Sequence, residues 1–168
     1  EGLTNDVLLF TVDTGAGVDF DYTLSDAAGN VLVRSDNVFA RGDFALSSAG
    51  DVRLGDVAGV AIDADAGRDV TLTADGAIVN NGGSIAMDGG DLTLSAGTSI
   101  GSAATPIATT GSHGLRADAA LGGVFITNGT GGTVTVNGTG VSGAGAPVEL
   151  RNAAGALVIA AGGVSTTG

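Results

Sequence analysis

Hydrophobic and polar residues alternate with a period of two along much of the chain, and turn-forming segments interrupt this alternation at short, regular intervals. The clearest stretch, residues 69–78, reappears as residues 91–100, a shift of about 22 residues. Alternation bounded by Gly, Asn or Asp predicts short β-strands. A fixed shift of this length predicts one supersecondary unit stacked on the next. The pattern therefore predicts an all-β, parallel β-solenoid with three short strands in each rung of roughly 22 residues.

The shift also predicts which side chains point into the solenoid. Val70 and Leu72 should lie next to Leu92 and Leu94 on the following rung, and Ile78 should lie next to Ile100. The structural core is predicted to contain Val70, Leu72, Ile78, Ile85, Leu92, Leu94 and Ile100.

A glycine followed by aspartate introduces several of the predicted strands, as in residues 42–46, 50–54, 67–72 and 89–94. Glycine supplies the backbone angles that a corner needs. An aspartate side chain can accept a hydrogen bond from the backbone of its own turn. We therefore predict corner turns at Asp43, Asp51, Asp69 and Asp91.

The regular rhythm divides the chain into two parts. Residues 1–34 are predicted to be a less regular β segment that acts as a cap, a junction or a strand-donating end, with strands near residues 7–10 and 20–24. Residues 35–168 are predicted to form the solenoid repeats. The chain starts in mid-pattern and stops at Gly168 without a capping element, which predicts a segment of a longer protein or a processed product.

Composition and charge narrow the possible functions. The chain has 31 Gly, no Cys, few aromatic residues and a net charge of −12. Such a charge repels phosphate backbones and anionic lipids, so we expect neither nucleic-acid binding nor membrane binding. No run of 18 apolar residues is present, and this excludes a membrane-spanning helix.

Acidic residues near the third predicted corner resemble a broken calcium loop. The weak ligand candidates are Asp63, Asp65, Asp69 and Asp75. The spacing places Arg68 where it would oppose a cation, and the glycine is displaced from the position that a calcium loop requires. A solvated acidic corner is the favoured interpretation, and calcium is the one cofactor that the sequence leaves open.

Catalytic chemistry finds little support in the sequence. His113 is the only histidine and is predicted to lie in a surface loop, because glycine and serine flank it. Asp63 and Asp65 would share one face of a strand, as carbohydrate-cleaving enzymes can require. No cluster of arginine and aromatic residues accompanies them. We therefore predict a protein without catalytic residues.

Four segments carry a resemblance to a known family: AGRDVTLTADGAI (66–78), GGDLTLSAGTSIGS (89–102), GTVTV (132–136) and GALVIAAGG (155–163). They resemble the shaft repeats of filamentous-haemagglutinin-type adhesins and related large exoproteins of Gram-negative bacteria, over about residues 29–160. The resemblance implies a right-handed parallel β-helix, export to the bacterial cell surface, and a role in attachment or filament building.

These observations predict a structural or adhesive module of a secreted surface protein or filament. Its expected partners are other copies of itself, or the rest of a longer chain, joined end to end, together with a surface glycan or protein receptor. Two alternatives stay open: a fragment of a β-helical polysaccharide-active enzyme, and a calcium-stabilised extracellular module.

Overall fold

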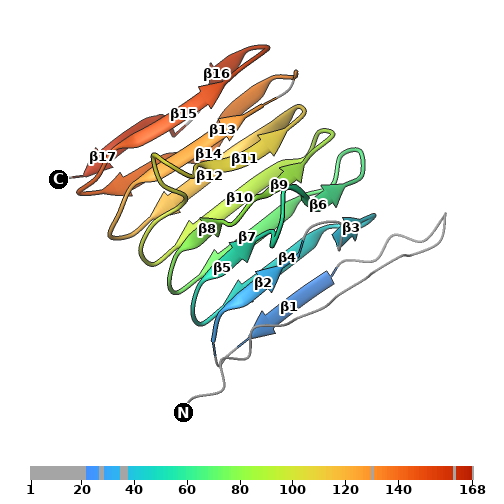
Figure 1. Ribbon diagram of the computed structural model, residues 1–168. Helices are drawn as coiled ribbons and strands as arrows, with labels where there is room; N and C mark the ends of the chain where they lie inside the picture. The colour runs from blue at the N-terminus through green and yellow to red at the C-terminus, as the bar shows by residue number, and fades with distance from the viewer. Residues whose placement is uncertain (1–21, 27–28, 35–37, 130, 161, 168) are drawn as a thin grey trace.

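The computed structural model describes residues 22–26, 29–34, 38–129, 131–160 and 162–167, and within them the only regular elements are β-strands (Figure 1). All of the paired strands run parallel to one another and form three sheets. The strand predicted near residues 7–10 lies outside the described residues, as does the start of the one near 20–24. No helix that could span a membrane occurs in the described part of the chain.

The three sheets form the walls of the solenoid. Sheet A contains, in spatial order, β1 (Tyr22–Asp26), β4 (Phe44–Ser48), β7 (Val70–Ala74), β10 (Asp91–Ala96), β12 (His113–Ala119), β14 (Val134–Ala144) and β16 (Leu157–Ile159), with β17 (Val164–Thr167) also paired to β14. Sheet B contains β3 (Val38–Ala40), β6 (Gly59–Ala64), β9 (Gly83–Ala86), β11 (Ile107–Thr110), β13 (Val124–Asn128) and β15 (Val148–Asn152). Sheet C contains β2 (Val31–Val33), β5 (Val52–Leu54) and β8 (Ile78–Asn80).

The register confirms the predicted stacking of the rungs. Val70 pairs with Leu92 and Leu72 pairs with Leu94, which is the shift that the sequence repeat predicts. The step to the next rung, where Leu92 pairs with Leu115, is slightly longer. The step between β4 and β7 is longer again, because larger corners are inserted there. The chain thus forms a parallel β-solenoid of about six turns with about 23 residues per turn.

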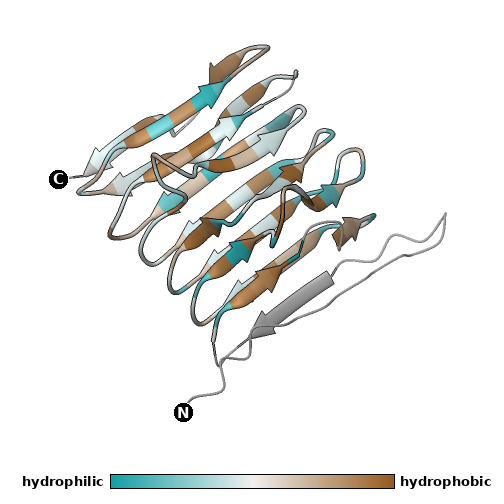
Figure 2. Ribbon diagram, in the orientation of Figure 1, coloured by the Kyte–Doolittle hydropathy of each residue, from teal (hydrophilic) through white to brown (hydrophobic). Residues whose placement is uncertain are grey.

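The alternation along each strand determines which side chains form the core. In β7 the burial alternates residue by residue, with Val70, Leu72 and Ala74 inside and the two threonines partly exposed. Figure 2 shows the same alternation of hydrophobic and polar positions along the stacked strands. All seven residues predicted for the core are at most 1% exposed. Stacking of like on like brings each apolar side chain into contact with its equivalents above and below.

The cross-section changes along the solenoid. Three rungs, β1–β2–β3, β4–β5–β6 and β7–β8–β9, have the three strands that were predicted. Beyond β8, the third wall continues only as single bridges from Ile78 to Ile100 and from Ile100 to Val124. Val124 also begins β13, so the position of the third wall and that of sheet B lie on the same strand there, and the rungs β12–β13 and β14–β15 contain two strands.

The described residues before position 34 already belong to this stack. β1 pairs in register with β4, and β2 pairs with β5. Val31 and Val33 are buried like their equivalents in later rungs. The first rung of the solenoid therefore begins before residue 34, inside the segment that was expected to be less regular.

Candidate functional site

The predicted corner aspartates connect successive rungs. The Asp69 backbone N–H donates to Oδ1 of Asp43 at 3.0 Å, and the Asp91 N–H donates to Oδ1 of Asp69 at 2.8 Å. Each carboxylate therefore accepts a hydrogen bond from the backbone N–H of the equivalent residue one rung later. The prediction had each carboxylate accept a hydrogen bond from the backbone of its own turn. The acidic side chains at this corner stabilise the stack rather than a single turn.

Asp51 has the same role at the second corner. Its own N–H donates to Oδ1 of Asn30 at 2.7 Å, and its Oδ1 accepts a hydrogen bond from the Ala77 N–H at 2.9 Å. Arg53 also lies within ion-pair distance of the Asp51 carboxylate, at 3.7 Å. Asn30 and Asp51 thus play the same part on successive rungs, because each supplies a side-chain oxygen acceptor to the next rung.

Asp91 extends this pattern across two rungs. Its carboxylate accepts hydrogen bonds from Nη2 of Arg116 at 2.7 Å and from Nδ2 of Asn137 at 2.9 Å. The residue above Asp91 in the register is Gly114, and a Cβ at that position would collide with the Asp91 carboxylate. The missing side chain at Gly114 thus allows one carboxylate on β10 to contact residues on both β12 and β14.

The four calcium candidates are not gathered into a site. Asp63 lies on β6, Asp65 follows that strand, Asp69 precedes β7 and Asp75 follows it. All four are exposed, and the described part of the chain contains no group of three acidic or histidine residues placed to hold a metal ion. These four aspartates are close in the sequence, but the corner between β6 and β7 and the whole of β7 lie between them, so they are separated in space.

The prediction that His113 lies in a surface loop is wrong. His113 is the first residue of β12 and is 3% exposed, with its side chain on the same face as Leu115, Ala117 and Ala119. The corner before β12 ends at residue 112, earlier than its glycine and serine content suggested. His113 therefore takes part in the alternation of inward and outward side chains along β12. Neither ring nitrogen makes a hydrogen bond of full geometry among the described residues, and a weaker interaction with the Gly111 backbone only partly offsets the effect of burial on the pKa. Burial lowers the pKa of His113 because the charged form loses its hydration.

The solenoid also contains an internal polar ladder that the sequence analysis did not identify. Thr109, Asn128 and Asn152 stack in register on β11, β13 and β15. Oγ1 of Thr109 donates to Oδ1 of Asn128 at 3.1 Å, and Nδ2 of Asn128 donates to Oδ1 of Asn152 at 3.0 Å. Nδ2 of Asn128 also donates to the Gly111 carbonyl. The available signal was an asparagine shortly after the apolar residues of two successive predicted strands.

Sheet A presents small hydroxyl side chains to solvent over part of its outer face. Thr71 and Thr73 on β7 lie beside Thr93 and Ser95 on β10. On the next strand the equivalent positions are Arg116 and Asp118, which interrupt the array. The regular hydroxyl surface is therefore limited to the earlier rungs.

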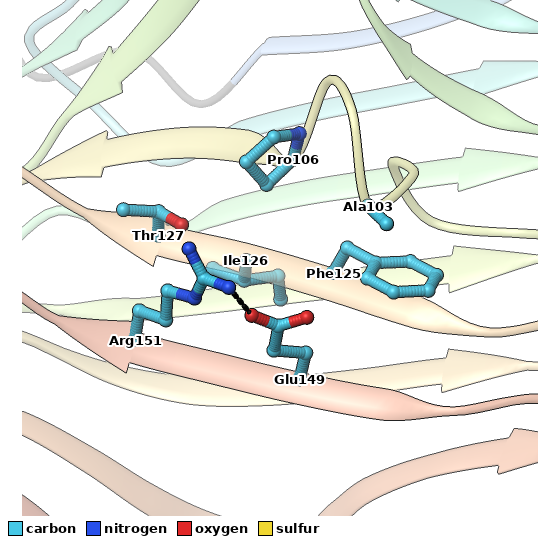
Figure 3. Close-up of a pocket in the computed structure, with 7 residues that line it drawn as sticks. All are labelled: Ala103, Pro106, Phe125, Ile126, Thr127, Glu149 and Arg151. Atoms are coloured by element: carbon cyan, nitrogen blue, oxygen red, sulfur yellow. Dashed lines mark ion pairs between the residues drawn. The ribbon is translucent and has the colours of Figure 1, made fainter.

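The outer face of sheet B carries a shallow depression near the C-terminal end of the stack (Figure 3). Phe125 and Thr127 project from β13, and Glu149 and Arg151 project from β15 directly beside them in the register. Nη2 of Arg151 forms an ion pair with Oε1 of Glu149. Ala103 and Pro106 line the depression from the segment that precedes β11. This is a mixed surface with one aromatic ring and one charged pair.

Comparison of the chain with protein-family models, with curated proteins and with solved structures finds no match.

Proposed function

We propose that this protein is a structural and adhesive module of a secreted bacterial surface protein or filament, and that copies of it assemble end to end. The resemblance of its repeats to the shafts of filamentous-haemagglutinin-type adhesins is the reason for the bacterial surface location. The solenoid fold supports a structural role, because a stack of rungs makes a rod that can be lengthened by adding further rungs.

The observation that carries the proposal is the state of the last rung. Leu157, Val158 and Ile159 of β16 are 41%, 40% and 51% exposed, and Val164 of β17 is 44% exposed. Their equivalents in the middle rungs are either inward and buried or outward and polar. Among the described residues, sheet B ends at β15, while sheet A continues to β16 and β17.

The edge of β15 adds backbone groups to this apolar surface. An edge strand presents N–H and C=O groups that can pair with a further strand. A further rung that stacked on this end, from a second copy or from the rest of a longer chain, would cover the four exposed apolar side chains and pair with β15. A head-to-tail contact of this kind does not close on itself, so it produces an open filament.

A non-catalytic role is part of the proposal. His113 points into the core, where it cannot approach a substrate on the surface. Asp63 lies on β6 and Asp65 follows that strand; both are exposed, and the register pairs Asp63 with Phe39 and Ala86 rather than with a second catalytic group. The surface also carries a net charge of −12, which opposes close lateral packing of shafts and favours contacts at their ends.

Light scattering on the isolated 168-residue chain tests the assembly. We expect the mean mass to rise with concentration, and the double substitution Ile159→Asp with Val164→Asp to abolish that rise. Val57→Asp is the matched control, because Val57 is 62% exposed in the loop between β5 and β6, away from the last rung. A constant monomer mass over a wide concentration range, or equal effects of the terminal and control substitutions, would contradict end-to-end assembly.

A further inference from the structure

Phe125 is the only Phe, Tyr or Trp in the sequence after residue 45, and its side chain lies on the outer surface of the solenoid. Phe125 belongs to β13, where Val124, Ile126 and Asn128 point inward and Phe125 is partly exposed. Apart from Thr109, His113 and Asn128, the core of the same rungs is built from aliphatic residues. A large ring in an outward position therefore does not serve the packing of the core.

The local backbone holds the Phe125 ring in place. A Cβ at Gly123 would lie 2.7 Å from Cε2 of the ring, so the ring packs directly over the glycine backbone. Ala103 and Pro106 lie along the other side of the depression (Figure 3). The ring is fixed by small or rigid neighbours while it still lines a surface that solvent reaches.

Polar groups of both kinds lie next to this ring. Figure 3 shows the side chains of Glu149 and Arg151 facing each other beside Phe125, with the Thr127 hydroxyl on the adjacent strand. A guanidinium has five N–H donors and a carboxylate has about four acceptor positions, so their ion pair leaves donors and acceptors available. The Arg151 side chain is 70% exposed and the Glu149 side chain is 37% exposed, which keeps these groups accessible.

We propose that this depression is a binding subsite for one neutral pyranose unit of a glycan. The C–H groups on one face of the sugar would pack on the Phe125 ring, whose face carries negative electrostatic potential. Two neighbouring hydroxyls would accept a hydrogen bond from Arg151 and donate one to Glu149. A hydroxyl can do both, and this matches a site that offers a donor and an acceptor side by side.

Charge selects a neutral sugar over an anionic one. Glu149 and the net charge of −12 oppose uronic acids and sulfated sugars. A shallow site with a single ring predicts weak affinity for one sugar unit. Repetition along an assembled filament would then raise the overall affinity through multivalency.

This inference deepens the adhesive part of the proposed function, since it names the class of partner. It depends on the proposed end-to-end assembly only for multivalency. The sugar titration uses the dilute chain, whereas assembly is tested by light scattering, so the failure of one proposal is distinguishable from the failure of the other.

The test is a titration of the 168-residue protein with methyl glycosides of glucose, galactose and mannose, followed by amide chemical shifts in NMR spectra. We expect saturable shifts confined to residues near 125–127 and 149–151 for at least one of them. Phe125→Leu and Arg151→Gln should each weaken binding by about tenfold or more, a difference that such titrations resolve. Methyl glucuronide should bind more weakly than the matching glucoside.

Thr73→Ala on the outer face of sheet A is the control and should leave the titration unchanged. Arg151→Gln keeps the proposal testable even if Phe125→Leu disturbs β13, because the Arg151 side chain is largely exposed. Absence of saturable shifts up to about 0.1 M of every neutral glycoside would overturn the proposal, since the affinity would then be too weak to matter. Shifts elsewhere on the protein, or shifts that survive both substitutions, would overturn it as well.

Discussion

The middle and the last rung of this solenoid carry the same kind of apolar strand but differ completely in burial. Leu92 and Leu94 on β10 are at most 1% exposed, because β7 and β12 lie on either side of them. Leu157 and Ile159 on β16 are 41% and 51% exposed, because among the described residues β14 is their only sheet neighbour. Burial in a solenoid is thus a property of the neighbouring rungs rather than of the strand itself.

The largest expected effect comes from introducing an aspartate in a middle rung and, for comparison, in the last rung. Leu94→Asp buries a carboxylate without a partner and should destabilise the fold by about 4 kcal/mol or more. Ile159→Asp places the charge at the exposed end and should cost about 1 kcal/mol or less. Urea unfolding followed by circular dichroism measures both changes. Similar losses for the two variants would show that the last rung is as buried as the middle ones.

The polar ladder gives a second, smaller contrast. Asn128→Ala removes the partner of Thr109 and of the Gly111 carbonyl within a buried column, and should cost about 2 kcal/mol. Asn152→Ala acts at the sheet edge, where water can replace part of what is lost, and should cost about 1 kcal/mol. Denaturant midpoints compare the two. A larger loss at Asn152 would reverse the order that the structure predicts.

His113 predicts a pH dependence that belongs to the middle of the stack. Burial lowers its pKa in the folded protein, so the unfolded chain binds the extra proton more readily. Stability should therefore be fully present above the ordinary histidine pKa and should decline as the pH falls from about 6.5 toward the lowered folded value.

His113→Leu should remove this component, because the chain has no other histidine. Unfolding midpoints at about pH 7.5 and 5.5 make the comparison above the range where most carboxylates titrate. If the wild-type protein and the variant lose stability in parallel over this interval, the dependence arises elsewhere.

The smallest expected effect concerns the bonds between rungs at the acidic corner. Asp69→Ala removes the acceptor for the Asp91 N–H and should cost about 0.5 kcal/mol, since water reaches this corner and can take over the bond. Amide hydrogen exchange at residue 91 should accelerate, while Asp75→Ala should leave it unchanged. Equal exchange in both variants would show that the carboxylate is not the protecting acceptor.

Much of the fold follows from the sequence because a solenoid is a local repeat. The period-two alternation identified the inward side chains of β7 and β10, and the repeat shift identified Leu92 as the neighbour of Val70. Both predictions depend only on spacing along the chain. Each rung contacts its direct neighbours, so spacing and contact remain closely linked.

The candidate sites follow from the sequence much less well, since they combine residues from different rungs. The acidic residues near the third corner looked like one loop, yet a corner and the whole of β7 separate them. The depression joins Phe125 to Arg151 because β13 and β15 are adjacent in sheet B, and no motif along the chain signals that pair.

Alternation and glycine placement alone thus determined the parallel stack, its apolar interior and its acidic corners. Only the tertiary structure shows where each corner ends. His113 was expected in a surface loop, but it lies in the core. The stack also gave Asp69 an acceptor role toward the next rung, and it left Ile159 exposed in spite of its apolar strand. The physical reason is that burial and hydrogen bonding depend on the rung above and the rung below, which the local sequence does not contain.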